Sequence, residues 1–290
     1  MEIKELLREL ELRPLKRLGQ NFLVDERVLR RILAEAEVGP EDTVLEVGSG
    51  LGTLTRALAE RARRVVAVEI DEQFVAVLRQ RLEAFPNTEI VLGDILALDI
   101  ARLVQEEPTH GLSSYKVVAN IPYYITSAVL RHLLEASVRP QLVVLMVQRE
   151  VAQRIVAKPG QMSVLAVSVQ FYGQPRIVTR VSARSFYPVP KVDSALVRID
   201  PYQELALGPN SIDPFFDVVR AGFAQRRKQL RNALVHGLAL PVEYISKVMT
   251  AAGIEEQRRA QTLSVREWVA LYYALGSVSK RGTDKAGVNN

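Results

Sequence analysis

Short apolar segments alternate along the first half of the chain with segments in which apolar residues recur every three or four positions. The apolar segments are rich in valine, isoleucine and leucine, which is typical of strands buried on both faces of a parallel sheet. The intervening segments have the period of amphipathic helices. We therefore expect a Rossmann-like α/β fold, with a doubly wound sheet and right-handed crossovers. The expected strands lie at 43–47, 65–70, 89–94, 116–120 and 142–147, and the expected helices at 53–61, 72–84 and 126–136.

Two further strand candidates, 176–181 and 194–199, have no helical pattern between them. Consecutive strands without a crossover helix pair antiparallel. We expect them to add an antiparallel pair to the sheet, which then has seven strands.

The pattern changes after residue 200, so the first expected domain is 1–200, with an N-terminal helical extension at 1–24. Segment 201–213 is rich in proline, glycine and polar residues, which indicates a linker. Helical spacing then predicts a small all-helical domain over 214–276, and the tail at 277–290 has too little to bury to be ordered. The expected helices of this domain lie at about 214–223, 226–236, 241–252 and 264–275.

The stretch LEVGSGLGTLT places three glycines between the first expected strand and the next helix. Gly48, Gly50 and Gly52 let the chain turn sharply and a ligand approach the backbone. Glu69 ends the second strand 21 residues after Gly48, where an acidic side chain accepts the hydroxyls of a ribose. Asp94 ends the third strand and is placed to accept a hydrogen bond from an adenine amino group. Together these residues predict an adenosine site; a tight turn with two helix caps is the structural alternative.

The glycine spacing lacks the G-x-x-G step of the dinucleotide fingerprint, which favours a ligand with adenosine but no pyrophosphate. S-adenosylmethionine fits that description. The chain contains no cysteine, which removes thiolate metal sites and the nucleophile that methylation of a pyrimidine carbon usually needs. The three histidines lack metal-ligand spacing, so we expect no metal. Methylation of an amino group survives these exclusions.

The fourth strand ends in Asn-Ile-Pro-Tyr, where α/β sheets bind their ligands. An adenine amino group is a poor nucleophile because its lone pair is delocalised, and two acceptors would turn the nitrogen towards tetrahedral geometry. The side-chain oxygen of Asn120 and the carbonyl of Ile121 are such acceptors, and Pro122 keeps the preceding residue extended. Tyr123 is placed to stack on the base. The alternative is a helix start with Asn120 as its cap.

Charge differs between the two parts of the chain. Residues 1–100 carry 14 Lys and Arg against 19 Asp and Glu, a net charge of −5, whereas residues 101–290 carry 24 against 14, a net charge of +10. A basic second part favours a polyanionic partner, with a solvated surface as the alternative. The candidate phosphate contacts, expected within one or two turns of a helix, are Arg226, Arg227, Lys228 and Arg231.

The pattern does not indicate a membrane protein. The longest apolar run, LVVLMV, is too short to cross a bilayer. The N-terminus lacks the uninterrupted apolar segment of a signal peptide. We therefore expect a cytoplasmic protein.

Eight motifs occur in the order in which a known family carries them. They are LGQNFLVD (18–25), EVGSGLGTLT (46–55), AVEID (67–71), GDIL (93–96), ANIPYYIT (119–126), SFYPVPKVDS (185–194), FAQRRKQLRNAL (223–234) and RAQTLSV (259–265). On these motifs the chain resembles the bacterial small-subunit (16S) ribosomal RNA adenine N6,N6-dimethyltransferases over nearly its whole length.

The resemblance implies a methyltransferase domain that uses S-adenosylmethionine. It implies that Asn21 and Leu23 contact the cofactor from the N-terminal segment and that Gly48 lies by its methionine part. Asn120 would lie between the cofactor and the target amine. A phenylalanine of the F-x-P-x-P-K loop, here Phe186, would close over the target base and sandwich it against the tyrosine of Asn-Ile-Pro-Tyr.

The family's substrate is a pair of adjacent adenosines in a hairpin loop near the 3′ end of 16S ribosomal RNA, each receiving two methyl groups. The resemblance implies that the partner is this RNA in the immature 30S particle, with a role in small-subunit biogenesis. Unpaired loop bases suit such an enzyme because they are accessible. Nothing in the sequence requires more than a monomer.

Three other functions stay open. The first is methylation of one adenine of large-subunit ribosomal RNA by a resistance-type relative, against which the full helical domain argues. The second is an assembly factor that acts mainly by binding, against which the intact site residues argue. The third is methylation of DNA adenine, for which the same Asn-Ile-Pro-Tyr chemistry would serve.

Overall fold

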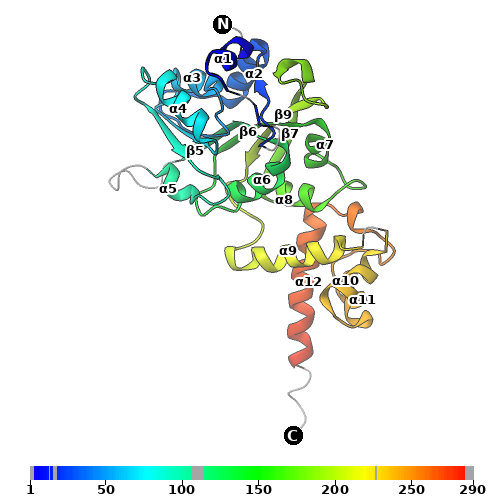
Figure 1. The fold of residues 1–290 in the computed structure, drawn as a ribbon. Coiled ribbons are helices and arrows are strands. Elements are labelled where there is room, and N and C mark those ends of the chain that lie inside the picture. The colour runs from blue at the N-terminus through cyan, green and yellow to red at the C-terminus, as the bar shows by residue number, and fades with distance from the viewer. Residues whose placement is uncertain (1–2, 13, 16–17, 106–113, 226, 285–290) are drawn as a thin grey trace. The chain divides into compact units, whose positions relative to one another are not determined.

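The chain folds into two compact units in the computed structural model (Figure 1). The structure describes residues 3–12, 14–15, 18–105, 114–225 and 227–284. The first unit comprises Met1–Gln153 and Gly173–Pro201, and the second comprises Arg154–Tyr172 and Tyr202–Asn290.

The first unit is built on a sheet in which seven described strands follow the order β4-β3-β2-β5-β6-β9-β7. The strands from β4 to β6 run parallel. Strand β9 is antiparallel to both β6 and β7, which confirms the predicted antiparallel pair. The strands are β2 (Thr43–Val47), β3 (Arg64–Glu69), β4 (Thr88–Leu92), β5 (Tyr115–Asn120), β6 (Leu142–Gln148), β7 (Gly173–Val181) and β9 (Ser194–Pro201).

The direction in which the chain crosses the sheet reverses between β2 and β5. From β2 the chain proceeds outward to β3 and β4, and from β5 it proceeds the other way to β6. Right-handed crossovers on the two sides place their helices on opposite faces, and ligands of such sheets bind at the strand ends beside the reversal. The helices of this part are α2 (Glu26–Ala36), α3 (Thr53–Ala59), α4 (Glu72–Arg81), α5 (Ile100–Val104), α6 (Thr126–Leu134) and α7 (Arg149–Ile155).

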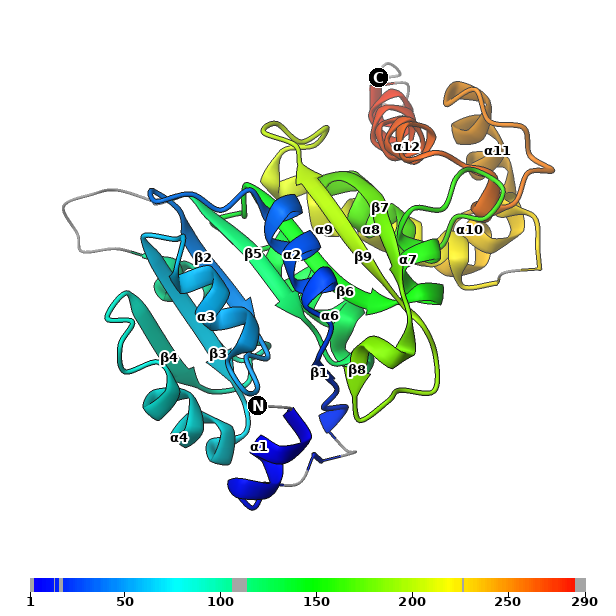
Figure 2. The same ribbon diagram turned by 90° about the horizontal axis from the view of Figure 1, so that it is seen from above.

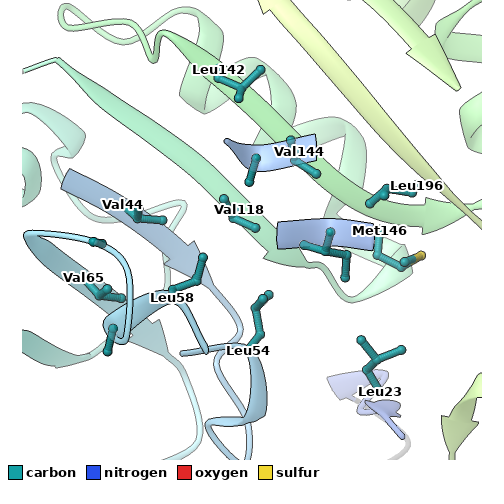
Figure 3. Packing of buried hydrophobic residues seen from close by; sticks show 14 of the residues in the cluster. Leu23, Val44, Leu54, Leu58, Val65, Val118, Leu142, Val144, Met146 and Leu196 are labelled. Carbon is teal, nitrogen blue, oxygen red and sulfur yellow. The ribbon is translucent and has the colours of Figure 1, made fainter. Parts of the chain in front are cut away.

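Helices α2 and α3 cover one face of the sheet (Figure 2). An apolar cluster joins them to it, with Val44, Val118 and Val144 from neighbouring strands and Leu54 and Leu58 from α3 (Figure 3). Full burial of a side chain of this size contributes about 1.5–3 kcal/mol. The cluster fixes α3 and, with it, the glycine turn that precedes this helix.

The described residues of the N-terminal extension include both a helix and a short strand. Helix α1 spans Ile3–Glu9, whereas β1 (Phe22–Leu23) pairs antiparallel with β8 (Phe186–Tyr187). The expected helical extension is therefore wrong at β1, because hydrogen bonds to β8 hold the backbone extended. We call residues 18–25 the N-terminal strap.

The described part of the second unit is helical. Phe171 stacks on Phe215 with ring centroids 4.9 Å apart, and Phe216 contacts both rings edge-on at 5.5 and 5.0 Å. These rings join helix α8 to α9, so a helix that precedes β7 in sequence belongs to the second unit. The helices are α8 (Val164–Tyr172), α9 (Pro209–Phe223), α10 (Leu230–Leu238), α11 (Val242–Ala251) and α12 (Val265–Asp284).

Several expected boundaries of the second unit differ from those observed. Helix α9 begins at Pro209 inside the expected linker, because a proline at the first helical position costs no hydrogen bond. Helix α10 begins at Leu230 rather than 226. Helix α12 continues to Asp284, so the expected disordered tail is helical at its start, and 285–290 lie outside the described residues.

Candidate active site

A cavity of about 1190 Å³, counting its open mouth, lies at the carboxyl ends of β2, β3, β4 and β5. Its position is the strand-order reversal between β2 and β5, where ligands of α/β sheets bind. The N-terminal strap supplies one wall. The residues predicted from the sequence that line this cavity are Asn21, Leu23, Gly48, Gly50, Glu69, Asp94, Asn120, Ile121, Pro122 and Tyr123.

The glycine turn is tight and fits closely against its neighbours. Gly48, Gly50 and Gly52 have φ values of 77°, 54° and 79°, in the left-handed region that side chains disfavour. A Cβ atom at Gly50 would lie 2.9 Å from the ring of Phe22 in the strap. The turn therefore needs glycine for its conformation and, at Gly50, for the approach of the strap.

Glu69 is held at the base of the cavity by backbone hydrogen bonds. Its Oε2 accepts the Gly50 N–H at 2.8 Å, and its Oε1 accepts the N–H groups of Ile70 and Asp71, both at 3.0 Å. Burial raises the pKa of this carboxyl, while the three N–H donors act in the opposite direction. A carboxylate has about four acceptor positions, so this one keeps capacity for a ligand hydroxyl in a fixed direction.

Asp94 stabilises a turn in addition to its place in the cavity wall. Its Oδ1 accepts the N–H of Leu96 at 3.0 Å, which stabilises the turn after β4. The side chain is exposed. No described helix begins at this turn, so Asp94 is not the helix cap of the structural alternative, and its Oδ2 stays a candidate acceptor for a ligand amino group.

Asn120 ends β5, and its carboxamide is oriented by the strap. Its Nδ2 donates to the backbone carbonyl of Asn21 at 3.0 Å. Because the amide nitrogen is engaged in this way, the side-chain oxygen is the atom left to accept a hydrogen bond. Asn120 does not cap α6, whose N-cap residue is Ile125, so the helix-start interpretation is wrong.

Pro122 and Tyr123 continue the same wall. Pro122 has extended backbone angles, φ −54° and ψ 132°, and its ring packs beside Gly48, so the two loops of the reversal are in contact. The hydroxyl of Tyr123 forms a hydrogen bond of 2.7 Å with the hydroxyl of Ser194, a buried residue of β9. Burial raises the pKa of the Tyr123 phenol, so the phenol stays protonated at neutral pH. This bond anchors the far end of a side chain that lines the cavity.

Phe186 does not lie where the family resemblance places it. Its side chain is 1% exposed and belongs to the apolar cluster with Leu23 and Ile32, and it does not line the cavity. The cause is its pairing opposite Leu23 in the β1–β8 ribbon, which turns the ring into the core. The expectation that Phe186 closes over a base is therefore wrong for this structure.

Three residues that the sequence analysis did not single out also shape the site. Ser194 anchors Tyr123, and Gln20 ties the strap to Asp71 through a hydrogen bond of 3.0 Å. Glu46 of β2 lines the cavity and is 1% exposed. The sequence contains a signal for Glu46, because a charged residue inside the apolar run TVLEV is expected to be buried together with that run.

The expected basic cluster is only partly assembled on a helix. Arg227 and Lys228 lie in the turn before α10, and Arg231 lies in its first turn. Arg231 pairs with Glu256 at 2.5 Å, which offsets its charge. Arg226 lies outside the described residues. Arg227 and Lys228 therefore stay the better candidates for phosphate contacts.

Neither a bilayer-spanning helix nor a metal-binding group occurs among the described residues. The helices there do not combine the length and apolar character needed to span a bilayer. The His, Asp and Glu side chains there form no group of three or more suited to a metal ion.

The fold and the site define a Rossmann-like methyltransferase with a C-terminal helical unit. The family model for ribosomal RNA adenine dimethylase matches residues 13–272. The chain belongs to this family, which confirms the resemblance carried by the eight motifs. It is 46% identical over 271 residues to the ribosomal RNA small subunit methyltransferase A of Dehalococcoides mccartyi, a match that covers 93% of this chain and 91% of the relative.

Two solved structures support the same assignment of the fold. A dimethyladenosine transferase from Plasmodium falciparum aligns with a TM-score of 0.75 at 26% identity, covering 89% of this chain and 98% of that one. The 23S rRNA methyltransferase ErmE aligns with a TM-score of 0.69 at 31% identity, covering 88% of this chain and 100% of that one. The predicted Rossmann-like sheet with a helical C-terminal region is thereby confirmed.

Proposed function

We propose that this chain uses S-adenosylmethionine to dimethylate N6 of two adjacent adenosines in the hairpin loop near the 3′ end of 16S ribosomal RNA. The observation that carries the proposal is the fixed carboxamide of Asn120, which offers an acceptor oxygen at the switch point of the sheet. The proposed partner is the precursor 30S particle, on which the chain would act as a monomer during subunit biogenesis. This partner implies a cytoplasmic location.

The cavity residues fit the proposed cofactor. Glu69 would hold the ribose and Asp94 the adenine amino group, while Gly48 and Gly50 admit the ligand close to the backbone. Asn21 and Leu23 would close the site from the strap. The bound cofactor would supply an activated methyl group on a sulfonium.

The chain's own groups would act on the adenine amine. The side-chain oxygen of Asn120 and the backbone carbonyl of Ile121 would accept hydrogen bonds from the two N–H groups of the amine. This would turn the nitrogen lone pair towards the methyl carbon. Neither group is a strong base, so the proton leaves to water after transfer. Alignment of this kind lowers a barrier by roughly 7–11 kcal/mol in well-oriented reactions.

Tyr123 would stack on the target base. Its bond to Ser194 would hold the end of the ring in place beside the base. Stacking of a base on an aromatic ring contributes roughly 1–3 kcal/mol. Arg227 and Lys228 would contact RNA phosphates, with Arg231 contributing less because Glu256 neutralises it.

The relatives support the small subunit over the large one. The small-subunit relative is 46% identical to this chain, compared with 31% for the 23S rRNA methyltransferase ErmE. A protein that acts only by binding would not need the Asn120 carboxamide oriented. The chemistry of the site does not distinguish adenine in RNA from adenine in DNA, so the methyl-transfer experiment below decides between them.

The test is methyl transfer from labelled S-adenosylmethionine to immature 30S particles, mature 30S and 50S subunits, free RNA and DNA, followed by mapping of the modified bases. Asn120→Ala should keep cofactor affinity and lose transfer, whereas Asn210→Ala, at an exposed position of α9, should retain it. Label in 50S RNA or DNA alone would overturn the substrate, and full turnover by Asn120→Ala would overturn the orienting role.

A further inference from the structure

Glu46 is a buried carboxyl group for which the proposed reaction has no use. It lies in β2 two residues after Val44, on the face covered by α3, and is 1% exposed. Its Oε2 has no hydrogen-bond partner in the described part of the chain. The residue nevertheless lines the cavity, so a ligand that enters can supply the missing partner.

The groups that face Glu46 make its ionised form unfavourable in the absence of a ligand. They are the hydroxyls of Thr55 on α3 and Ser49 in the glycine turn, and the carboxyl of Glu69 at the end of β3. None of these described neighbours is a cation, and Glu69 has the same sign of charge. A buried carboxylate without a cation is costly, so such a group binds a proton instead.

We propose that Glu46 is protonated in the ligand-free protein and loses its proton when a cationic ligand enters, so that uptake of S-adenosylmethionine releases one proton. The proposal rests on the proposed function for the identity of the ligand. The partner of the carboxylate would be an aliphatic cation of the methionine part, either the ammonium or the sulfonium.

The direction of the pH dependence follows from linkage. Burial, followed by the charge of Glu69, raises the pKa of Glu46 to about 8. Below that pH the free protein must give up a proton to bind, so affinity rises about tenfold per pH unit between pH 6 and 7. An α-amino group titrates at about 7.7–8.0, so the ligand keeps its charge over this interval.

The experiment is titration calorimetry of S-adenosylmethionine into the full chain at pH 6.0, 6.5 and 7.0, in buffers of different ionisation enthalpy. For the wild type we expect release of close to one proton and an affinity that rises about tenfold over the interval. Glu46→Gln should release almost none and show an affinity independent of pH. Glu72→Gln, at an exposed position in the first turn of α4, should behave as the wild type.

Two further ligands identify the cation. S-adenosylhomocysteine keeps the ammonium and lacks the sulfonium, so proton release with it supports the ammonium, and release with S-adenosylmethionine alone supports the sulfonium. 5′-Methylthioadenosine has neither cation and should release no proton.

Binding of S-adenosylmethionine with an enthalpy independent of buffer would overturn the inference and leave the proposed function intact. The same holds if Glu46→Gln released as many protons as the wild type, since Glu69 would then be the source. Proton release with methylthioadenosine equal to that of S-adenosylmethionine would also overturn it. Absence of any binding by the wild type would instead contradict the proposed function.

Discussion

Substitution of Phe186 by alanine should destabilise the protein rather than remove a contact to the target base. The ring is 1% exposed and packs in the cluster that joins the sheet to α2 and α3. Truncation of a buried phenylalanine to alanine costs about 3–5 kcal/mol, because the lost burial and the remaining cavity both count. Domains are typically stable by about 5–15 kcal/mol, so a large part of the total would be lost.

The measurement is urea unfolding of the wild type, Phe186→Ala and Phe186→Leu, combined with methyl transfer per folded molecule under conditions in which each variant is folded. We expect a large fall in the unfolding midpoint for alanine, a smaller one for leucine, and kcat within about tenfold of the wild type for both. Val189→Ala is the matched control, because Val189 lies in the same loop and is 61% exposed. Its unfolding free energy should change by at most about 0.5 kcal/mol.

The opposite result would refute the reasoning. If Phe186→Ala unfolded at the same urea concentration as the wild type and lost kcat by more than a hundredfold, the ring would have to leave the core during catalysis. The family-derived role of Phe186 would then stand, and the β1–β8 pairing would describe a resting arrangement.

Three more predictions concern the cavity. Gly50→Ala should weaken cofactor binding by tenfold or more, since its Cβ would meet the ring of Phe22 at 2.9 Å. The control is Gly253→Ala, at a similar φ of 70° with no atom within 4 Å, which should cost only about 1–2 kcal/mol of stability. Equal cofactor affinities of the Gly50→Ala variant and the wild type would contradict this prediction. Glu69→Ala should lower cofactor affinity by about two orders of magnitude in calorimetry, and an unchanged value would count against the ribose assignment. In the ligand-free protein the pKa of Glu46 is raised to about 8 from an ordinary value of 4.5, so the folded state binds the proton more tightly than the unfolded state. The contribution of Glu46 to stability should therefore be highest below pH 4.5. It should fall by at most about 1.4 kcal/mol per pH unit as the pH rises to about 8. Urea midpoints of Glu46→Gln should lack that fall, and a parallel decline in both proteins would refute it.

The sheet and most of the cavity wall could be predicted because they depend on local signals. Continuous apolar strands separated by helices determine the sheet, and the carboxyl ends of its parallel strands share one edge. Glu69, Asp94 and Asn120 each follow an apolar run directly, so their convergence follows from the topology alone.

The errors arise where long-range packing overrides the local pattern. Helix α8 is absent from the predicted elements because its residues are nearly all apolar and buried, so they show no helical period. One of its buried faces packs against α9 through Phe171 and Phe215. Pro209 and Pro214 predict a linker when the sequence is read alone, whereas in the structure both lie in the first two turns of α9. The orientation of Phe186 depends on its register with Leu23, more than 160 residues earlier, which no local signal contains.

One hydrogen bond connects the two halves of the proposed site. The carbonyl of Asn21 belongs to the strap, which we propose to lie on the cofactor side, and it accepts a hydrogen bond from the Asn120 amide, which we propose to face the substrate. The strap is held in turn by the Gln20–Asp71 bond and by the contact of Phe22 with Phe74, at a centroid distance of 5.3 Å. A change that loosens the strap therefore reaches the acceptor oxygen as well as the cofactor wall. We expect a change in the position of the strap to alter the orientation of the Asn120 amide through this backbone atom, which no substitution of the Asn21 side chain can remove.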